Sequence, residues 1–214
     1  DSNLIQKGLI HMKNTKLKGN LMLLLTAFIW GVSFIAQSKG VEEISPSAFN
    51  GIRSILGGLV LLPVIYIIDS GKKKRGQPVA PVDKTLLLGG LACGVILCLA
   101  STIQTIGLKY TSPGKGGFIT ALYMVFVPII GLFTGKKLRP VLVAAVLVAV
   151  CGLYLMCINS ELAINKGDIL IFICAILFTA HILVIDKVSP LVDGVKLSCI
   201  QFFVCGIINV LWMF

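Results

Sequence analysis

The chain has 214 residues, of which 57% are hydrophobic and 13% are charged, and its mean hydropathy is +0.97. A soluble domain carries about 25% charged residues, so this composition excludes a water-facing globular surface and makes the lipid bilayer the main solvent. The net charge of +10 does not indicate a nucleic-acid partner, because the charges lie in short segments between apolar runs and form no basic face.

Seven apolar runs divide the chain, and we predict that each crosses the membrane as a helix. Each is close to the ~20 residues that a helix needs to span ~30 Å of hydrocarbon, and a lone strand would leave its backbone unpaired in lipid. In chain order the runs are Leu21–Ser38, Ser47–Ile68, Leu86–Leu108, Gly114–Phe133, Val141–Ile158, Asp168–Ile185 and Leu197–Phe214. The short joints between them predict antiparallel neighbours. Before the fourth run, Ser112 and Pro113 predict an N-cap with proline at the first helical position.

Motifs of enzymes and metal proteins are missing from the sequence. All seven cysteines lie inside apolar runs without a CxxC pair, which favours packing residues over disulfides or metal ligands. Gly114-Lys115-Gly116 lacks the spacing of a phosphate-binding loop, and no HExxH, GxSxG or paired acidic motif occurs. We therefore expect no catalytic centre, no metal and no cofactor. Gly90 and Gly94 form a GxxxG motif, which favours a close helix contact.

The distribution of basic residues sets the predicted orientation. With the N-terminus in the cytoplasm, fourteen of the nineteen basic residues lie in cytoplasmic segments, four lie outside, and Arg53 is within a span, as the positive-inside rule requires. The cytoplasmic set is Lys7, Lys13, Lys16, Lys18, Lys72, Lys73, Lys74, Arg75, Lys84, Lys136, Lys137, Arg139, Lys187 and Lys196. The external set is Lys39, Lys109, Lys115 and Lys166.

An internal repeat appears at an offset of 148 residues. Lys18-Gly19-Asn20 matches Lys166-Gly167-Asp168, Ile52-Arg53 matches Ile200-Gln201, and Gly58 matches Gly206. Five spans separate the two copies, and five is odd, so the copies enter the membrane from opposite sides. Inverted repeats of this kind are typical of secondary transporters. If the period holds, the second copy extends to about residue 313, and about three further helices are expected.

In addition, the sequence resembles the EamA-type transporters of the drug/metabolite transporter superfamily, over residues 17 to 214. The resemblance is carried by Ala27-Phe28-Ile29-Trp30-Gly31-Val32-Ser33-Phe34, by Pro46 with Arg53 seven residues later, by the stretch from Gly107 to Tyr123 with Val127-Pro128, and by Lys166-Gly167-Asp168. It implies ten helices in two inverted five-helix repeats and export or exchange of small metabolites at the plasma (inner) membrane. Gly135-Lys136-Lys137 stands where members often have Gly-Glu, so a role for that acidic position is in doubt.

Repeat and resemblance together predict an all-α polytopic transmembrane helix bundle, with seven spans present of ten. Residues 1–20 are expected to form a cytoplasmic tail, residues 21–160 the first five-helix repeat, and residues 166–214 the start of the second, truncated repeat. The expected function is secondary active transport of a small-molecule solute by alternating access. A homodimer is left open.

Polar residues inside the spans are the candidate site. Thr26, Trp30, Ser33 and Gln37 form one stripe of the first helix, and Asn50 and Arg53 share a face of the second. Polar groups at mid-membrane depth tend to face a bundle interior or a wet cavity, although they also join helices structurally. The expected substrate-binding residues are Trp30, Ser33, Gln37, Asn50, Arg53, Gln104, Thr120, Tyr123, His181 and Gln201.

Two of these residues suggest particular chemistry. Arg53 costs ~2.5–3.5 kcal/mol at the centre of a span, so a substrate carboxylate or phosphate is one expected partner, and snorkelling or bonds to carbonyls are the structural alternatives. His181 is the side chain deep in a span whose ordinary pKa is near neutrality, which suggests proton coupling. The structural alternative, which we favour, is a neutral histidine hydrogen-bonded to a neighbour.

Three other functions remain in competition. A channel for small solutes is the main alternative to a carrier. An intramembrane enzyme requires a nucleophile–base pair or acidic metal ligands, which the spans lack. A seven-helix receptor leaves the inverted repeat unexplained.

Overall fold

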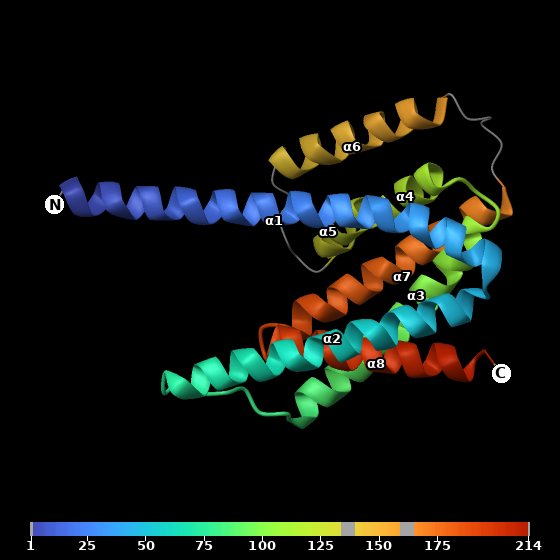
Figure 1. Cartoon of the computed structure of the whole chain (residues 1–214). Coiled ribbons are helices and arrows are strands. Elements are labelled where there is room, and N and C mark those ends of the chain that lie inside the picture. The colour runs from blue at the N-terminus through green and yellow to red at the C-terminus, as the bar shows by residue number, and fades with distance from the viewer. Residues whose placement is uncertain (1, 134–139, 159–164, 214) are drawn as a thin grey trace. The chain divides into compact units, whose positions relative to one another are not determined.

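The computed structural model describes residues 2–133, 140–158 and 165–213, and the regular structure in these ranges is entirely helical (Figure 1). The expected all-α class is therefore confirmed for the described residues. The helices are α1 Ser2–Glu43, α2 Pro46–Lys74, α3 Lys84–Leu108, α4 Pro113–Ala121, α5 Tyr123–Phe133, α6 Pro140–Ile158, α7 Lys166–Val188 and α8 Gly194–Leu211. Gly135, Lys136, Lys137 and Arg139 of the predicted fourth joint lie outside the described residues.

Within the described ranges, six segments are long and apolar enough to cross a membrane. They are Leu17–Glu43, Pro46–Lys74, Lys84–Leu108, Pro113–Leu132, Lys166–Val188 and Gly194–Leu211, and they correspond to six of the seven predicted runs. The remaining run, Val141–Ile158, is helical in α6, and its crossing of the membrane stays a prediction.

Two elements differ from the expected ones. The fourth run is not one helix, because α4 ends at Ala121 and α5 begins at Tyr123. At the break, the Leu122 N–H donates to the Ile119 carbonyl at 3.1 Å and the Val125 N–H to the Leu122 carbonyl at 2.9 Å, and such i to i+3 bonds tighten the turn. The first helix begins at Ser2 instead of Leu21, so the predicted tail is helical.

Side-chain caps explain where several helices begin. Ser112 Oγ accepts from the Lys115 N–H at 3.3 Å with Pro113 in the first turn, which confirms the predicted cap. Ser45 caps α2 by accepting from the Ala48 N–H at 3.2 Å, and Asp193 caps α8 by accepting from the Val195 N–H at 3.0 Å. Each cap satisfies a backbone donor that has no partner within its helix.

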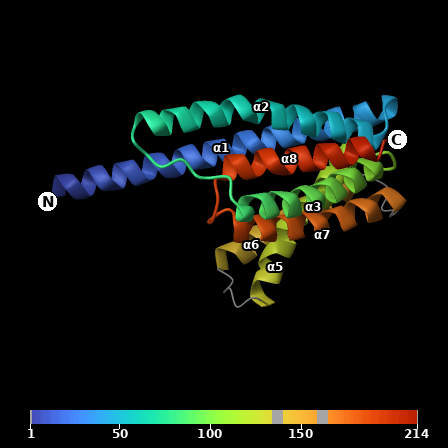
Figure 2. The same cartoon turned by 90° about the horizontal axis from the view of Figure 1, so that it is seen from below.

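The chain divides into two units, one up to Ala36 and one from Gln37 onward. In the second unit, α3 packs against α7 and α8, and α8 packs against α2 (Figure 2). Gly94 of α3 lies so close to α8 that an added Cβ would be 2.9 Å from the Gln201 carbonyl oxygen. The predicted close contact at the GxxxG motif is therefore confirmed.

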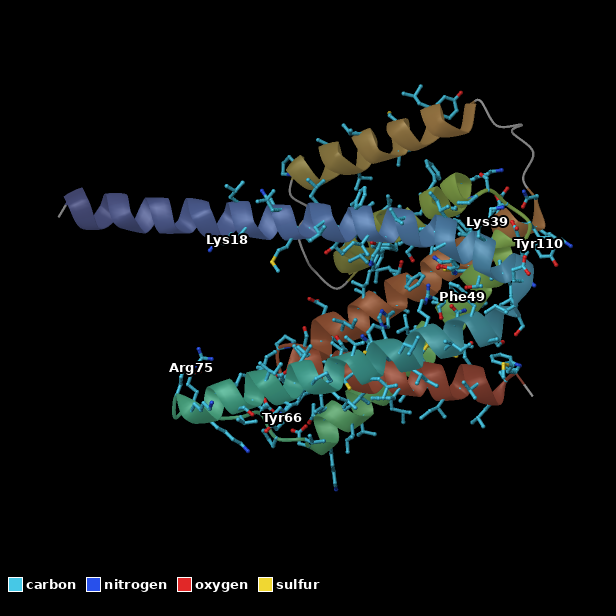
Figure 3. The ribbon with its side chains drawn as sticks, in the orientation of Figure 1. Lys18, Lys39, Phe49, Tyr66, Arg75 and Tyr110 are labelled. Carbon is cyan, nitrogen blue, oxygen red and sulfur yellow. The ribbon has the colours of Figure 1, made fainter. Side chains whose placement is uncertain are left out.

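Ion pairs lie at both ends of this second unit. Figure 3 shows Lys39, Phe49 and Tyr110 at one end, here called the Lys39 end, and Arg75 at the opposite end of α2, the Arg75 end. At the Lys39 end, Lys115 Nζ is 2.6 Å from Asp168 Oδ2. At the Arg75 end, Lys196 pairs with Asp69 at 2.9 Å and Lys72 with Asp193 at 3.1 Å. Between these ends, α2, α3, α7 and α8 each bury polar side chains.

Candidate functional site

A hydrogen-bonded cluster joins α1, α2 and α3 near the Lys39 end. We call it the Arg53 network, and its members are Gln37, Asn50, Arg53, Ser101 and Thr105. Gln37, Asn50 and Thr105 are 2%, 0% and 0% exposed, so burial excludes solvent as their partner. Asn50 Nδ2 donates to the Ser101 carbonyl at 3.1 Å and to Thr105 Oγ1 at 3.0 Å. Gln37 Nε2 also donates to Thr105 Oγ1.

The hydroxyl of Thr105 is at the centre of this network. It donates to the Ser101 carbonyl of its own helix at 2.7 Å and accepts from the amides of Gln37 and Asn50. One proton and two lone pairs are thereby all used. Since both amide nitrogens are held on Thr105, the oxygens of both amides are free to face Arg53.

The guanidinium of Arg53 donates a hydrogen bond to each of these two amide oxygens. Nη1 donates to Gln37 Oε1 at 3.3 Å and Nη2 donates to Asn50 Oδ1 at 3.0 Å, and the Phe49 ring centroid is 5.4 Å from the guanidinium carbon. Arg53 as a whole is exposed. Its described polar partners are both neutral amides, and the ion pairs that the structure describes do not include it.

A second polar pair lies nearer the Arg75 end. His181 of α7 and Gln201 of α8 are each 7% exposed, and His181 Nε2 is 3.0 Å from Gln201 Oε1. Because the amide oxygen can only accept, Nε2 is the donor of this bond in the tautomer that carries its proton there. The Phe178 ring packs on the imidazole edge to face, with centroids 6.5 Å apart.

The two clusters lie at equal depths from opposite ends. Arg53 is seven residues after the start of α2 at Pro46, and Gln201 is seven residues after the start of α8 at Gly194. Seven residues are about 10 Å of helix rise. The unit thus carries the Arg53 network in the half toward the Lys39 end and the imidazole–amide pair of His181 and Gln201 in the half toward the Arg75 end.

The remaining predicted residues are not joined to either cluster by a described contact. Gln104 Nε2 donates to Thr120 Oγ1 at 3.1 Å, and both are buried, so these two form a separate pair. Tyr123 is half-buried at the start of α5, and no described hydrogen bond joins it to the network. Trp30 and Ser33 belong to the other unit of the chain, and their part in the site stays a prediction.

Sequence reasoning missed buried polar groups of α3 and α8. The Thr105 hydroxyl and the Ser101 carbonyl complete the Arg53 network, and beside them Thr102 Oγ1 donates to Asn209 Oδ1 at 2.8 Å. Asn209 in turn donates to Cys98 Sγ at 3.1 Å. The available signal was the run Ser101-Thr102-Ile103-Gln104-Thr105, which is unusually polar for the middle of a span.

The described residues offer little other chemistry. No group of three His, Cys, Asp or Glu side chains among them could hold a metal ion. The cysteines with described side chains are free, and all but Cys151 are buried, in agreement with a packing role. What the unit does present is a buried set of amides and hydroxyls around one cationic group, which suits binding of a polar solute.

Known proteins similar to this chain are transporters. The profile of the EamA-like transporter family matches residues 17–158. An "Uncharacterized transporter" of Archaeoglobus fulgidus is 32% identical over 195 residues, which cover 91% of this chain and 57% of that protein. "Uncharacterized transporter YoaV" of Bacillus subtilis is 25% identical over 136 residues, 63% of this chain and 43% of that protein.

This chain therefore spans less than two thirds of the length of these relatives. No solved structure matches it. The family match and six segments able to cross a membrane agree on one conclusion. This chain is a multi-pass membrane protein and belongs to the EamA-like transporter family of the drug/metabolite transporter superfamily.

Proposed function

We propose that the chain is part of a secondary transporter that moves small metabolites across the plasma membrane by alternating access, as an exporter or exchanger. The observation that carries this proposal is the pattern of contacts between α2 and α8. These are the helices that the 148-residue repeat makes equivalent, and alternating access in inverted-repeat carriers depends on such equivalent helices.

Two close contacts between α2 and α8 have counterparts in which the two helices exchange roles. A Cβ at Gly206 would be 2.6 Å from Ile55, and one at Gly58 would be 3.1 Å from the Phe203 ring. Gly206 is Gly58 plus 148, and Phe203 is Ile55 plus 148. The pair is therefore reciprocal, as two copies related by a two-fold axis require.

A second reciprocal pair lies beside the first. Ser54 Oγ donates to Cys205 Sγ at 3.4 Å, while a Cβ at Gly57 would be 3.4 Å from the Phe202 ring. Under the offset of 148 residues, Ser54 is equivalent to Phe202 and Gly57 is equivalent to Cys205. The residue types differ between the copies, but the positions that meet are the same.

The starts of the two helices follow the same offset. Ser45 and Asp193 are the N-caps of α2 and α8, and they are 148 residues apart. Contacts pair early residues of α2 with late residues of α8, so the helices are antiparallel. An inverted repeat requires this arrangement, and we infer ten helices in two five-helix repeats, the first over residues 21–160 and the second beginning at 166.

The two polar clusters fit a solute path between such repeats. Arg53 and Gln201 are equivalent under the offset, and each is about 10 Å along its helix from the end where that helix begins. We infer that solute binds among the predicted residues of the second unit and that rocking of one repeat on the other exposes them to alternate faces. His181, hydrogen-bonded to Gln201, is the candidate for proton coupling.

A counterflow assay tests the carrier mechanism. The full-length protein is reconstituted in proteoliposomes and screened with labelled metabolites, with the same unlabelled solute inside or absent. A carrier shows saturable entry that internal solute accelerates. Entry that neither saturates nor responds to internal solute would establish a channel instead.

The matched variants His181→Gln and Thr179→Val test coupling. Both residues are buried on α7, but the Thr179 hydroxyl donates only to the Ala175 carbonyl of its own helix, at 2.8 Å. Under proton coupling, His181→Gln removes the response of flux to an imposed pH gradient and Thr179→Val keeps it. An unchanged response in both variants rejects the role of His181.

A further inference from the structure

We propose that the Arg53 network binds the carboxylate group of the transported solute, so that the substrates are small organic anions. This inference rests on the proposed transport function and names the substrate class. It starts from the observation that the guanidinium is held by neutral oxygens and has no described carboxylate within ion-pair distance.

The guanidinium retains donors that the described residues do not use. Arginine has five N–H groups in a planar fork, and two of them are directed to Gln37 Oε1 and Asn50 Oδ1. The side chain is exposed, so the others can reach a ligand. A carboxylate matches this fork with two parallel hydrogen bonds, and such charge-assisted pairs are the strong ones.

The surrounding amides hold the fork in place without neutralising it. Gln37 and Asn50 are anchored through their nitrogens on Thr105 and the Ser101 carbonyl, and they are almost fully buried. A side-chain carboxylate in their place would have cancelled the charge. A cation within a span is costly without a counter-charge. A solute that carries a carboxylate supplies this counter-charge, so its attraction to Arg53 contributes to binding instead of being cancelled within the protein.

A lipid phosphate is the competing source of negative charge. The network directs the guanidinium toward buried amides of α1 and α2, about 10 Å of helix rise from the start of α2. A snorkelling arginine instead extends toward the interface. We therefore commit to a solute carboxylate, and the experiment separates the two sources.

The test uses matched carboxylate and amide probes. Full-length protein in a non-ionic detergent is heated with butyrate or butyramide, and with benzoate or benzamide, and ligand affinity is taken from the concentration dependence of the thermal shift. Carboxylates are expected to raise the unfolding temperature and the amides are not. Loss of the charge in Arg53→Gln should weaken carboxylate binding at least about tenfold, since hydrogen bonds between charged groups are the strong class.

Two further variants keep the test decisive. Arg53→Lys retains charge without the fork and should bind carboxylates more weakly than the wild type but better than Arg53→Gln. Arg75→Gln is the control, because Arg75 is exposed at the opposite end of α2 and donates to the Gly71 carbonyl. If carboxylates stabilise Arg53→Gln as well as they stabilise the wild type, Arg53 is structural and the inference is overturned.

Lipid and flux measurements complete the discrimination. Stabilisation by added phosphatidylglycerol that depends on Arg53, with none by any carboxylate, assigns the residue to lipid and overturns the inference. Counterflow of neutral or cationic solutes that is unaffected by Arg53→Gln also overturns it, while the carrier mechanism stands. Carboxylate binding that depends on Arg53 without any counterflow supports the anion site and rejects the carrier.

Discussion

Replacing Thr105 by valine tests the central joint of the Arg53 network. Valine keeps the shape of threonine and removes its hydroxyl. That hydroxyl accepts from Gln37 and Asn50, which lie on two other helices, and donates to the Ser101 carbonyl. Asn50 retains the Ser101 carbonyl at 3.1 Å, whereas the Gln37 nitrogen loses its described acceptor. The substitution therefore removes two inter-helix bonds and leaves one buried donor unpaired.

The expected loss of stability follows from these bonds. Hydrogen bonds between helices in a membrane average about 0.6 kcal/mol and reach about 1.7, and an unsatisfied buried donor costs about 1–3 kcal/mol. We expect Thr105→Val to lower the free energy of unfolding by about 1–3 kcal/mol, on the order of 3–10 °C in unfolding temperature for a domain of this size. Carboxylate affinity should also fall, because the amides that orient Arg53 lose their anchor.

Thr179→Val provides the matched control. Thr179 is 1% exposed, as buried as Thr105, but its hydroxyl donates only within α7, to the Ala175 carbonyl. The unfolding temperature of both variants is measured in detergent. A fluorogenic maleimide reports unfolding, because it reacts with the buried cysteines as they become exposed. Equal unfolding temperatures for Thr105→Val and Thr179→Val would show that the inter-helix bonds of Thr105 contribute nothing and would refute this reasoning.

Three other predictions concern packing, pH and topology. Gly206→Leu should destabilise the protein by about 1–3 kcal/mol or more through overpacking, because a Cβ there would be 2.6 Å from Ile55. Gly152→Leu is the control and should not destabilise, because a Cβ at Gly152 would have nothing within 4 Å. The unfolding temperatures of both variants check this prediction. Burial alone would raise the pKa of Asp193, but hydrogen bonds from Lys72 and from the backbone of α8 outweigh burial and hold that pKa below its usual value. Its stabilising effect is therefore complete above the unfolded pKa of about 3.9 and is lost as pH falls through the folded value. Unfolding temperature measured between about pH 6 and pH 3 should accordingly fall more steeply for the wild type than for Asp193→Asn. Finally, single cysteines are placed at Lys73 and at Glu42 in a Cys151→Ser background. The cysteine at position 73 should react with an impermeant maleimide from the cytoplasmic side, and the one at position 42 from the opposite side. Reaction of both from one side contradicts the inverted topology.

Local sequence was enough to predict most of the helical segments. The apolar runs predicted six of the segments able to cross a membrane, because a helix in lipid must satisfy its own backbone and expose apolar side chains. The cap at Ser112 was predicted equally well, since it involves residues three positions apart. The break at Leu122 and the early start of α1 were not predicted, because neither changes the apolar pattern of the chain.

For the candidate site, the sequence predicted several of the residues but not the contacts between them. Gln37, Asn50 and Arg53 were predicted because polar residues are conspicuous in apolar spans. The 148-residue offset aligned Gly58 with Gly206 and Arg53 with Gln201 in the sequence. That Gln37 and Asn50 share the hydroxyl of Thr105, or that His181 meets Gln201, could not be predicted. These contacts depend on how far each helix is rotated about its axis and how closely glycines such as Gly94 let α3 approach α8. The sequence by itself therefore determined which segments are apolar and helical and which polar residues they carry. Only the tertiary structure decided which of those residues meet, because partners 55 and 68 residues apart are brought together by helix packing and not by local bonds.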